Sequence, residues 1–545
     1  MSETVLKVSA TGTGPAGGRE PSPWWKGAVI YQVYPRSFQD TNGDGIGDLP
    51  GITQRLDHIA SLGVQGLWIS PFFKSPMADY GYDVSDFCDV DPVFGTLDDF
   101  DALIARAHGL GLKVIIDQVY SHTSDQHPWF EDSRKSRDSE KSDWYVWADP
   151  NPDGTPPNNW QSVFGMGAWQ WDARRGQYYL HNFLVEQPDL NLHNPAVQDA
   201  ILDVTRFWLE RGVDGFRLDA LNFGFHDREL RDNPVETVFA RPPTRPFDFQ
   251  RHSMNMSQPE VVPFIERIRD VMDAFGAETF TVAEVGGPRP LEEMKAFTQG
   301  DARLNTAYAF DYLYADQITA DLVRKTQREW PGKPGEGWPS WAFENHDAPR
   351  AISRWSGTNP TDQYAKLLAL LLMALRGNAF LYNGQELGLE QAEIAFEDLR
   401  DPEAIANWPE TLGRDGARTP VPWTGAGNDF AGFSEAKPWL PLPDQHRAMS
   451  VEAQNASPDS VLAFTRRAVA LRAGCRILRE GEIAFRGEGE LLVFDRVLGG
   501  QTRRCVFNLG ERALPYAERV DAELSVGNVE GGEIAPGSGF ISPVS

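Results

Sequence analysis

Three carboxylic acids stand at or just beyond the ends of short apolar segments: Asp219, Glu284 and Asp347. In a barrel of parallel strands, the carboxyl ends of neighbouring strands meet on one face, so side chains at these positions come together. Glycoside hydrolysis needs two carboxyl groups in opposite protonation states, one as nucleophile or base and one as acid. A third carboxylate can hold the sugar ring, and the pattern therefore makes these three residues the candidates for catalysis.

The local sequence around the first two carboxylates predicts their protonation states. Arg217 lies two residues before Asp219 on an expected strand, so both side chains point to the same face. A guanidinium keeps a neighbouring carboxylate ionised, which suits a nucleophile. Glu284 lies between apolar neighbours, where burial raises its pKa as a general acid requires. Taken alone, the first pair also fits a buried structural salt bridge, and Glu284 also fits a capping residue.

An adjacent histidine and aspartate, His346 and Asp347, follow the aromatic segment Ser340–Phe343. At a strand end such a pair can hydrogen-bond substrate hydroxyls, and it can equally cap the next helix. Metal ligation is disfavoured because no third histidine stands at ligand spacing. The pair is therefore a candidate for substrate binding.

A loop from residue 40 to residue 48 reads Asp-Thr-Asn-Gly-Asp-Gly-Ile-Gly-Asp. Oxygen-bearing side chains recur in register at Asp40, Asn42, Asp44 and Asp48, with glycines that allow the tight wrap a hard cation requires. Gly51 stands where an EF-hand loop has its bidentate glutamate, and no expected helix precedes the loop. We therefore expect a standalone loop for a divalent cation, with a plain Asx/Gly turn as the alternative.

Eight short apolar segments alternate with helical patterns along the chain. They are Ala28–Tyr34, Gly66–Ser70, Lys113–Val119, Gly215–Ala220, Phe280–Val285, Leu304–Phe310, Ser340–Phe343 and Asn378–Tyr382. Largely apolar runs of this length are typical of strands buried on both faces of a parallel sheet. Eight such strands with intervening helices predict an α/β fold, a (β/α)8 barrel, whose functional groups gather at the carboxyl ends of the strands.

Two long stretches interrupt this alternation, and a third region follows it. Residues 121–186 exceed an ordinary βα loop and predict an inserted domain after the third strand, while 390–433 form a loop-rich insertion after the eighth. The barrel then covers residues 23–120 and 187–456, after a flexible tail at 1–22. Residues 457–545 predict a terminal helix and a C-terminal all-β domain, expected to be a β-sandwich, because short β-rich runs alternate there with glycine turns.

The composition excludes several classes of partner. The 545 residues include 51 Lys and Arg against 78 Asp and Glu, a formal net charge of −27, which nucleic acid and anionic membranes would repel. The longest apolar run, Leu367–Leu375, is too short to span a bilayer. Three cysteines far apart, with no signal-peptide pattern at the N-terminus, predict a reducing compartment and a cytoplasmic protein.

With these residues placed, the chain resembles the α-amylase superfamily of glycoside hydrolases, family 13, and within it the oligo-1,6-glucosidase/α-glucosidase group. The resemblance runs from about Trp24 to Ser545 and rests on several motifs in the family's order. They are Val29–Phe38 before the cation loop, Asp117–His122, Gln187–Asn191, Asn383–Leu387 and Arg414–Pro420. Ser121 departs from the family's pattern, in which the third-strand motif ends in Asn-His.

The resemblance implies a role for individual residues. It makes Asp219 the nucleophile, Glu284 the general acid/base, and Asp347 the residue that holds sugar hydroxyls and stabilises the transition state. The implied glucose-binding set is Asp79, Tyr82, His122, Phe164, Gln187, Arg217, His346 and Arg414, with Arg414 chosen over Arg418. The implied ligands of one structural divalent cation, Ca²⁺ or Mg²⁺, are Asp40, Asn42, Asp44, the Ile46 carbonyl and Asp48, and no organic cofactor is implied.

The implied activity is the retaining release of α-glucose from the non-reducing end of small oligosaccharide or disaccharide substrates, by a monomer or homodimer. Ala220 follows the nucleophile; in this group a small residue there resembles α-1,4-cleaving enzymes, and a valine resembles α-1,6-cleaving ones. We therefore expect a preference for maltose-type bonds, with transglucosylation as a side reaction. The alternatives are an oligo-1,6-glucosidase, a transglucosylase or sucrose-directed relative, and a non-catalytic scaffold associated with a transporter.

Overall fold

The computed structural model describes residues 22–239, 242–276, 278–359, 361–409, 413–425 and 430–544. Its centre is a closed barrel of parallel strands in the spatial order β1-β13-β12-β11-β10-β9-β5-β2. The strands are β1 (Val29–Val33), β2 (Gly66–Ile69), β5 (Lys113–Val119), β9 (Gly215–Asp219), β10 (Phe280–Val285), β11 (Thr306–Ala309), β12 (Trp338–Ala342) and β13 (Asn378–Tyr382). Each overlaps a predicted segment, so the predicted (β/α)8 barrel is confirmed. The predicted tail lies outside the described residues, except for its last position.

Apolar side chains fill the barrel and also join it to the surrounding helices. The interior cluster includes Ile30, Trp68, Ile115, Phe280, Val282, Tyr308, Ala342 and Phe380. The helices that follow the first seven barrel strands are α1 (Leu49–Ser61), α2 (Leu97–Gly109), α4 (Pro195–Glu210), α5 (Val261–Ala274), α6 (Pro290–Thr298), α7 (Ala320–Glu329), α8 (Ala351–Trp355) and α9 (Thr361–Ala374). Within the described part of the chain, no helix is long and apolar enough to cross a membrane.

The helix α13 (Val461–Gly474), which the sequence grouped with the C-terminal domain, packs against α9 of the barrel. Arg472 on α13 is buried, and its Nη1 donates to the carbonyls of Met373 at 2.7 Å and Leu375 at 2.9 Å. Those carbonyls lie at the C-terminal end of α9, where helical hydrogen bonding leaves them without partners. The structure therefore places α13 with the outer layer of the barrel.

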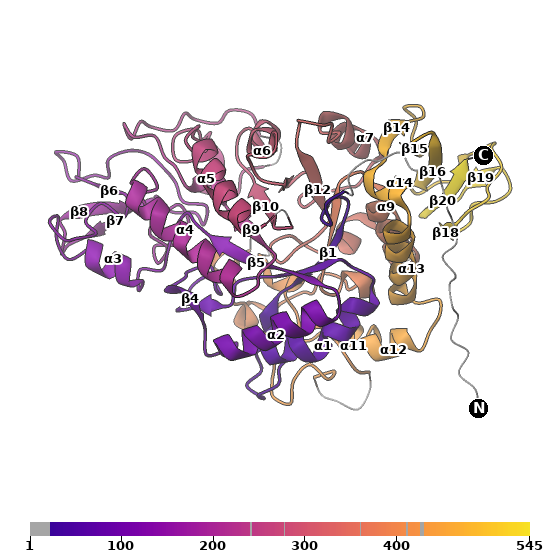
Figure 1. The fold of residues 1–545 in the computed structure, drawn as a ribbon, viewed down its shortest axis with the longest axis horizontal. Helices are drawn as coiled ribbons and strands as arrows, with labels where there is room; N and C mark the ends of the chain where they lie inside the picture. Colours follow the sequence, from indigo (N-terminus) through magenta and orange to yellow (C-terminus); the bar gives the residue numbers. More distant parts are fainter. Residues whose placement is uncertain are drawn as a thin grey trace.

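The long segment between β5 and α4 forms its own small unit. Its elements are α3 (Pro128–Ser133), β6 (Trp147–Ala148), β7 (Trp169–Asp172) and β8 (Gln177–Leu180). The strands form an antiparallel sheet in the order β6-β8-β7, and the unit projects from one end of the molecule (Figure 1). A short hairpin of β3 (Phe73–Lys74) and β4 (Asp86–Val90) follows β2 and carries Asp79 and Tyr82 in its connection.

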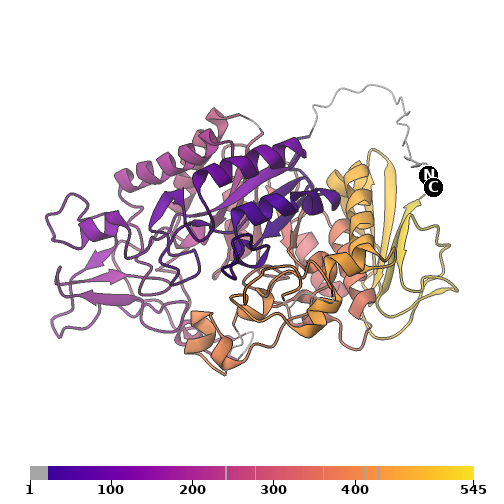
Figure 2. The same ribbon diagram turned by 90° about the horizontal axis from the view of Figure 1, so that it is seen from below.

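The C-terminal region is an antiparallel sheet at the opposite end of the molecule (Figures 1 and 2), and the predicted all-β region is confirmed. Its strand order is β14-β15-β16-β20-β18, with β17 paired to β19. The elements after β13 are α10 (Pro402–Ala406), α11 (Asp444–Ala448), α12 (Val451–Asn455), α14 (Arg476–Glu480), β14 (Glu482–Phe485), β15 (Leu492–Leu498), β16 (Gln501–Asn508), β17 (Leu514–Pro515), β18 (Leu524–Val526), β19 (Glu533–Ile534) and β20 (Ser538–Val544).

Candidate active site

The strand register places a buried arginine among three carboxylates. Arg217 on β9 pairs with Asp117 on β5, and Asp219 follows two positions later on the same strand. On the neighbouring strand β10, Glu284 lies in register with Tyr308 of β11. These positions lie toward the carboxyl ends of their strands, the end at which a barrel of this kind carries its functional groups.

The Arg217 guanidinium contacts all three carboxylates. Its Nη1 lies 2.8 Å from Asp117 Oδ1 and 2.5 Å from Asp219 Oδ1. Its Nη2 lies 2.6 Å from Glu284 Oε2, and the whole Arg217 side chain is buried. Because neighbouring nitrogens of one guanidinium hold Asp219 and Glu284, the two carboxyl groups lie close together. Such closeness suits direct attack by one of them, for which retaining glycosidases use a separation of about 5–5.5 Å.

Burial raises the pKa of both candidate catalytic carboxyls. Desolvation raises the pKa of Asp219 to about 7, against the lowering effect of Arg217. Desolvation likewise raises the pKa of Glu284 to about 7, and the nearby charge of Asp219 adds to the rise. The predicted rise for Glu284 is confirmed. The prediction that Arg217 keeps Asp219 ionised at neutral pH holds only in part, because desolvation outweighs a single guanidinium that three carboxyls share.

Asp347, the third candidate, has a different environment. Its Oδ1 lies 2.7 Å from Arg418 Nη2 and 3.4 Å from Arg414 Nη1, and its Oδ2 lies 3.3 Å from His346 Nε2. Burial opposes the ionisation of Asp347, but Arg418 and Arg414 outweigh it and hold its pKa well below the usual range. His346 adds no charge at neutral pH, because burial lowers its own pKa to about 3. Asp347 is therefore a permanent negative charge beside two carboxyls that can carry protons.

Polar side chains from separate segments close one end of the site. Gln187 Nε2 donates to Asp79 Oδ2 at 3.3 Å and lies 3.1 Å from His122 Nε2. Arg414 Nη2 lies 2.8 Å from Asp79 Oδ1. Ser121, the departure from the family motif, places its hydroxyl 2.9 Å from His122 Nδ1. These contacts join the β3–β4 connection, the inserted unit and the insertion after β13 into one wall.

His346 and Arg217 lie beneath the floor of the site rather than on its surface. The Nδ1 of His346 is 2.8 Å from Gln32 Nε2, and its ring stacks on Tyr82 with 5.5 Å between ring centroids. Both His346 and Arg217 are completely buried, so they support the side chains above them. Their implied contacts with glucose stay predictions.

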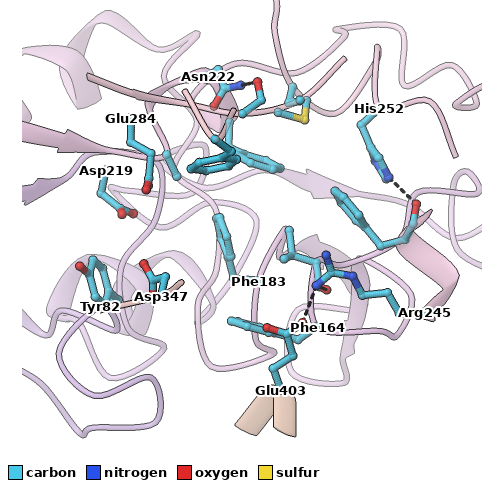
Figure 3. Close-up of a pocket in the computed structure, with 18 of the residues that line it drawn as sticks. Tyr82, Phe164, Phe183, Asp219, Asn222, Arg245, His252, Glu284, Asp347 and Glu403 are labelled. Carbon is cyan, nitrogen blue, oxygen red and sulfur yellow. Dashed lines mark hydrogen bonds and ion pairs between the residues drawn. The ribbon is translucent and has the colours of Figure 1, made fainter. Parts of the chain in front are cut away.

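A pocket of ≈ 720 Å³ opens above these residues (Figure 3), and its volume is typical of a site for a small molecule. The predicted site residues that line it are Asp79, Tyr82, His122, Phe164, Gln187, Asp219, Glu284, Asp347 and Arg414. Arg418 lies beneath the pocket, where its Nε donates to the His346 carbonyl at 2.6 Å. The geometry thus favours Arg414 over Arg418 for contact with a ligand.

Several pocket residues had no signal in the sequence. The aromatic wall contains Phe183, Phe223, Phe310 and Tyr314. The open side is lined by Glu236, Arg245, Phe247, Gln250, Arg251, His252, Met256 and Glu403. Six of these eight fall within positions 240–259 after β9, a segment that the sequence predicts to shape the acceptor side without specifying its conformation. Isolated aromatic and charged residues in loops carry no periodic pattern, so only tertiary contacts show which of them face the pocket.

The loop of residues 40–48 wraps around its own side chains. Asp40 Oδ1 accepts from the Asn42 amide at 2.9 Å, Asp44 Oδ1 accepts from the Ile46 amide at 2.8 Å, and Asp48 caps α1. These donors are neutral, so the negative charge of the loop suits a bound cation, and its oxygens suit Ca²⁺ or Mg²⁺. Among the described residues, no three acidic, histidine or cysteine side chains converge as a metal-ligand group. A cation would therefore need Asn42 and a backbone carbonyl to complete its oxygen shell.

Comparisons with known proteins agree with this geometry. Residues 32–481 match the family described as "Alpha amylase, catalytic domain". A probable α-glucosidase of Rhizobium meliloti is 53% identical over 96% of this chain and 94% of its own. An oligo-1,6-glucosidase of Heyndrickxia coagulans is 36% identical over 93% of this chain and 96% of its own. The crystal structure of the α-glucosyl transfer enzyme XgtA superimposes with a TM-score of 0.91 at 50% identity, covering 96% of this chain and 100% of that one.

Replacing Asp219 by its neutral amide tests the burial cost of its charge. The pKa is about 7 in the folded protein, against about 3.9 for an unfolded aspartate. Because folding raises this pKa, the wild type loses stability as pH rises from the unfolded pKa through the folded one, by about 1.4 kcal/mol for each pH unit between the two. We therefore expect the thermal midpoint of Asp219→Asn, minus that of the wild type, to increase from about pH 5 to about pH 8.

Asp444→Asn is the control, because that carboxyl is fully exposed and its replacement leaves burial unchanged. If the thermal midpoints of Asp219→Asn and the wild type differed by the same amount at every pH, the raised pKa of Asp219 would be contradicted. A wild type that gains stability over the variant as pH rises would contradict it too.

Proposed function

The chain belongs to the α-amylase family of glycoside hydrolases, and we propose that it is a retaining, exo-acting α-glucosidase that prefers α-1,4 bonds in short substrates. The observation that carries the proposal is the Asp219–Glu284 pair, held by one guanidinium in a pocket that side chains close at one end. A closed end beyond the reacting carboxyls has room for a terminal glucose but not for a chain that continues in both directions. Release from the non-reducing end follows from that shape.

In the first step, Asp219 attacks the anomeric carbon of the terminal glucose while Glu284 gives its proton to the glycosidic oxygen. The bond to the leaving sugar breaks, and a β-glucosyl ester forms on Asp219. In the second step, the ionised Glu284 takes a proton from water, which attacks the same carbon and frees Asp219. Two inversions at one carbon retain the α configuration.

Arg217 suits both halves of this cycle. Before attack, its guanidinium faces the charged Asp219 and the protonated Glu284. After attack, Asp219 is an uncharged ester, and Glu284 carries the negative charge opposite the same guanidinium. One cation therefore stays paired as the negative charge passes between two carboxyls, without a side chain having to move. Asp347, which remains ionised, supplies negative charge beside the oxocarbenium-like transition state and accepts hydrogen bonds from sugar hydroxyls.

Asp219→Ala removes the nucleophile and leaves the rest of the pocket in place. We expect maltose hydrolysis to fall by about 10³-fold or more, while maltose binding, measured by titration calorimetry, persists. Asp203→Ala, at an exposed carboxyl on α4, is the control and should hydrolyse maltose as the wild type does. Near-wild-type turnover by Asp219→Ala would show that another group attacks the sugar.

The residue after the nucleophile supports the proposed linkage preference. Ala220 lines the pocket directly beside Asp219 and adopts a left-handed backbone conformation with φ 40°. Its single methyl group leaves space next to the scissile bond. A valine there would add two methyl groups to the pocket wall and strain a backbone conformation that β-branched residues rarely adopt. The small side chain favours α-1,4 cleavage by its similarity to maltose-cleaving members of the group.

We expect the wild type to have a higher kcat/KM for maltose than for isomaltose. Ala220→Val should lower that ratio about tenfold or more, because it changes the wall beside the leaving sugar. Ala220→Ser, which stays small, is the matched control, and circular dichroism reports whether the valine variant folds. A wild type that cleaves isomaltose faster than maltose would support the oligo-1,6-glucosidase alternative instead.

Transglucosylation is a second candidate, favoured by the 50% identity to an enzyme described as transferring α-glucosyl groups. In that reaction a sugar hydroxyl replaces water in the second step, and Glu284 serves as base in the same way. A product time course at high maltose concentration, followed for trisaccharides, separates the two outcomes.

A cytoplasmic location is also proposed, because the cysteines Cys88, Cys475 and Cys505 are unpaired thiols.

The 40–48 loop is proposed to bind one structural divalent cation, Ca²⁺ or Mg²⁺. Its contribution would be to stabilise the N-terminal end of α1, which Asp48 caps, and no catalytic step passes through it.

Either cation should raise the thermal midpoint of the EDTA-treated protein, since a ligand at about 100 times its Kd stabilises the folded state by about 2.7 kcal/mol. Asp44→Ala should abolish that rise. Asp153→Ala, in another exposed turn whose carboxylate accepts from the Thr155 amide at 3.0 Å, should retain it. Equal midpoints with cation and with EDTA would leave the loop as a plain turn.

A further inference from the structure

One side chain at the open side of the pocket joins three segments that are far apart in the sequence. Arg245 precedes the short helix η3 (Pro246–Phe249) in the loop after β9. Its Nη1 lies 2.7 Å from Glu403 Oε1, on α10 in the insertion after β13. The same nitrogen donates to the Val163 carbonyl of the inserted unit at 3.0 Å. Arg245 therefore ties together the three loops that border this side of the pocket.

The Arg245–Glu403 pair lies on the side of the pocket away from Asp219 and Glu284, and Glu403 is near enough to Arg414 and Asp347 for their charges to act on its pKa. Both residues line the pocket. Figure 3 shows them on the side away from Asp219 and Glu284, with Phe183 between the two groups. The pocket thus has a polar wall behind the proposed glucose position at one end and an ion pair at the other.

The loop that carries Arg245 is fixed at its base and joined more weakly at its tip. Asn255 Nδ2 donates to Asn182 Oδ1 of the inserted unit at 2.7 Å, and Asn233 Nδ2 donates to Asn255 Oδ1 at 2.8 Å; all three amides are buried. The side chains of the ion pair are 25% and 20% exposed. Most of each charged side chain is shielded from water, so separating the pair costs more than separating a surface pair, while the buried amides keep the loop itself in place.

We propose that Arg245 and Glu403 form the distal wall of the acceptor side and set the chain-length limit of this enzyme, an inference that rests on the proposed α-glucosidase function. One leaving sugar occupies the space between Glu284 and the pair. A longer chain has to cross the line between the Arg245 guanidinium and the Glu403 carboxylate, and so has to separate them. Separation leaves the partly buried Glu403 carboxylate without this partner, while Arg245 keeps its contact with Asp248 at 3.2 Å. The loss at Glu403 disfavours long substrates.

The pair acts mainly on substrate length, because neither residue hydrogen-bonds or ion-pairs with Asp219, Glu284 or Asp347, although the charges of Arg414 and Asp347 reach Glu403 and act on its pKa. Its loss should therefore change the selectivity between short and long substrates and spare the reaction of a substrate whose leaving group is small. An effect on long substrates alone would indicate that the pair forms a wall, whereas an equal effect on both kinds of substrate would indicate that it holds the whole active site together.

The test compares kcat/KM for maltose and for maltotetraose in the full chain and in the variants Arg245→Ala and Glu403→Ala. We expect the ratio of maltotetraose to maltose to rise about tenfold or more in each variant. The kcat/KM for p-nitrophenyl α-glucoside should stay near that of the wild type. The double variant should resemble the single ones, because either substitution already removes the pair.

Charge reversal sharpens the test. Arg245→Glu places two like charges at the rim and should raise the ratio, whereas combining it with Glu403→Arg restores an opposite pair and should lower the ratio again. Arg503→Ala is the matched control: the Arg503–Glu523 pair on the C-terminal sheet is 23% and 30% exposed and lies away from the pocket. That variant should keep the wild-type ratio.

An unchanged ratio in both alanine variants and in Arg245→Glu would overturn the chain-length inference, while maltose hydrolysis by the wild type would still support the proposed function. A wild type without activity on maltose or p-nitrophenyl α-glucoside would instead overturn the function on which the inference rests. If the maltotetraose-to-maltose ratio also rose in Arg503→Ala, the chain-length inference would be overturned, because the effect would then not depend on the Arg245–Glu403 pair.

Discussion

The buried guanidinium of Arg217 among three carboxylates is the interaction on which the site depends. Asp117, Asp219 and Glu284 come from three adjacent strands, and each reaches the same cation only because the strands pair in one register. A shift of one residue would turn every such side chain to the other face of the sheet. Trp68 inside the barrel packs against the same guanidinium, with 5.1 Å from Arg217 Cζ to the ring centroid. The packed interior therefore fixes the geometry that catalysis needs.

Burial and charge divide the acidic residues of the site into two kinds. Where three carboxyls share one cation, desolvation raises the pKa of Asp219 and Glu284 to about 7, so the cluster titrates as a set near neutral pH. Where two arginines face one carboxyl, as at Asp347, burial no longer prevents ionisation. Proton transfer needs the first environment, and stabilisation of a cationic transition state needs the second. The ratio of cations to carboxylates, rather than burial alone, decides which role each residue can have.

The sequence predicted the barrel well because its signal is local. Short apolar runs with polar ends mark each strand, and the candidate carboxylates stand at those ends, so their meeting follows from the closure of the barrel. Other features depend on contacts between distant segments and had no local signal. The position of α13 depends on Arg472 reaching the carbonyls of Met373 and Leu375. The raised pKa of Asp219 depends first on its burial and then on Asp117, which adds a second negative charge beside Arg217. The two-residue spacing of Arg217 and Asp219 on one strand reveals neither of these contacts between distant segments.

The open side of the pocket shows why specificity was harder to derive than chemistry. The proposed catalytic carboxyls Asp219 and Glu284 lie on strands, whose alternation fixes where each side chain points. The proposed acceptor side is built from irregular loops, in which Arg245 and Glu403 are 158 residues apart and meet only in the folded chain. Loops tolerate substitution and insertion without loss of the core. The barrel can therefore keep one reaction while changes at the rim alter which sugars reach it, so substrate length and linkage have to be derived from contacts such as this pair.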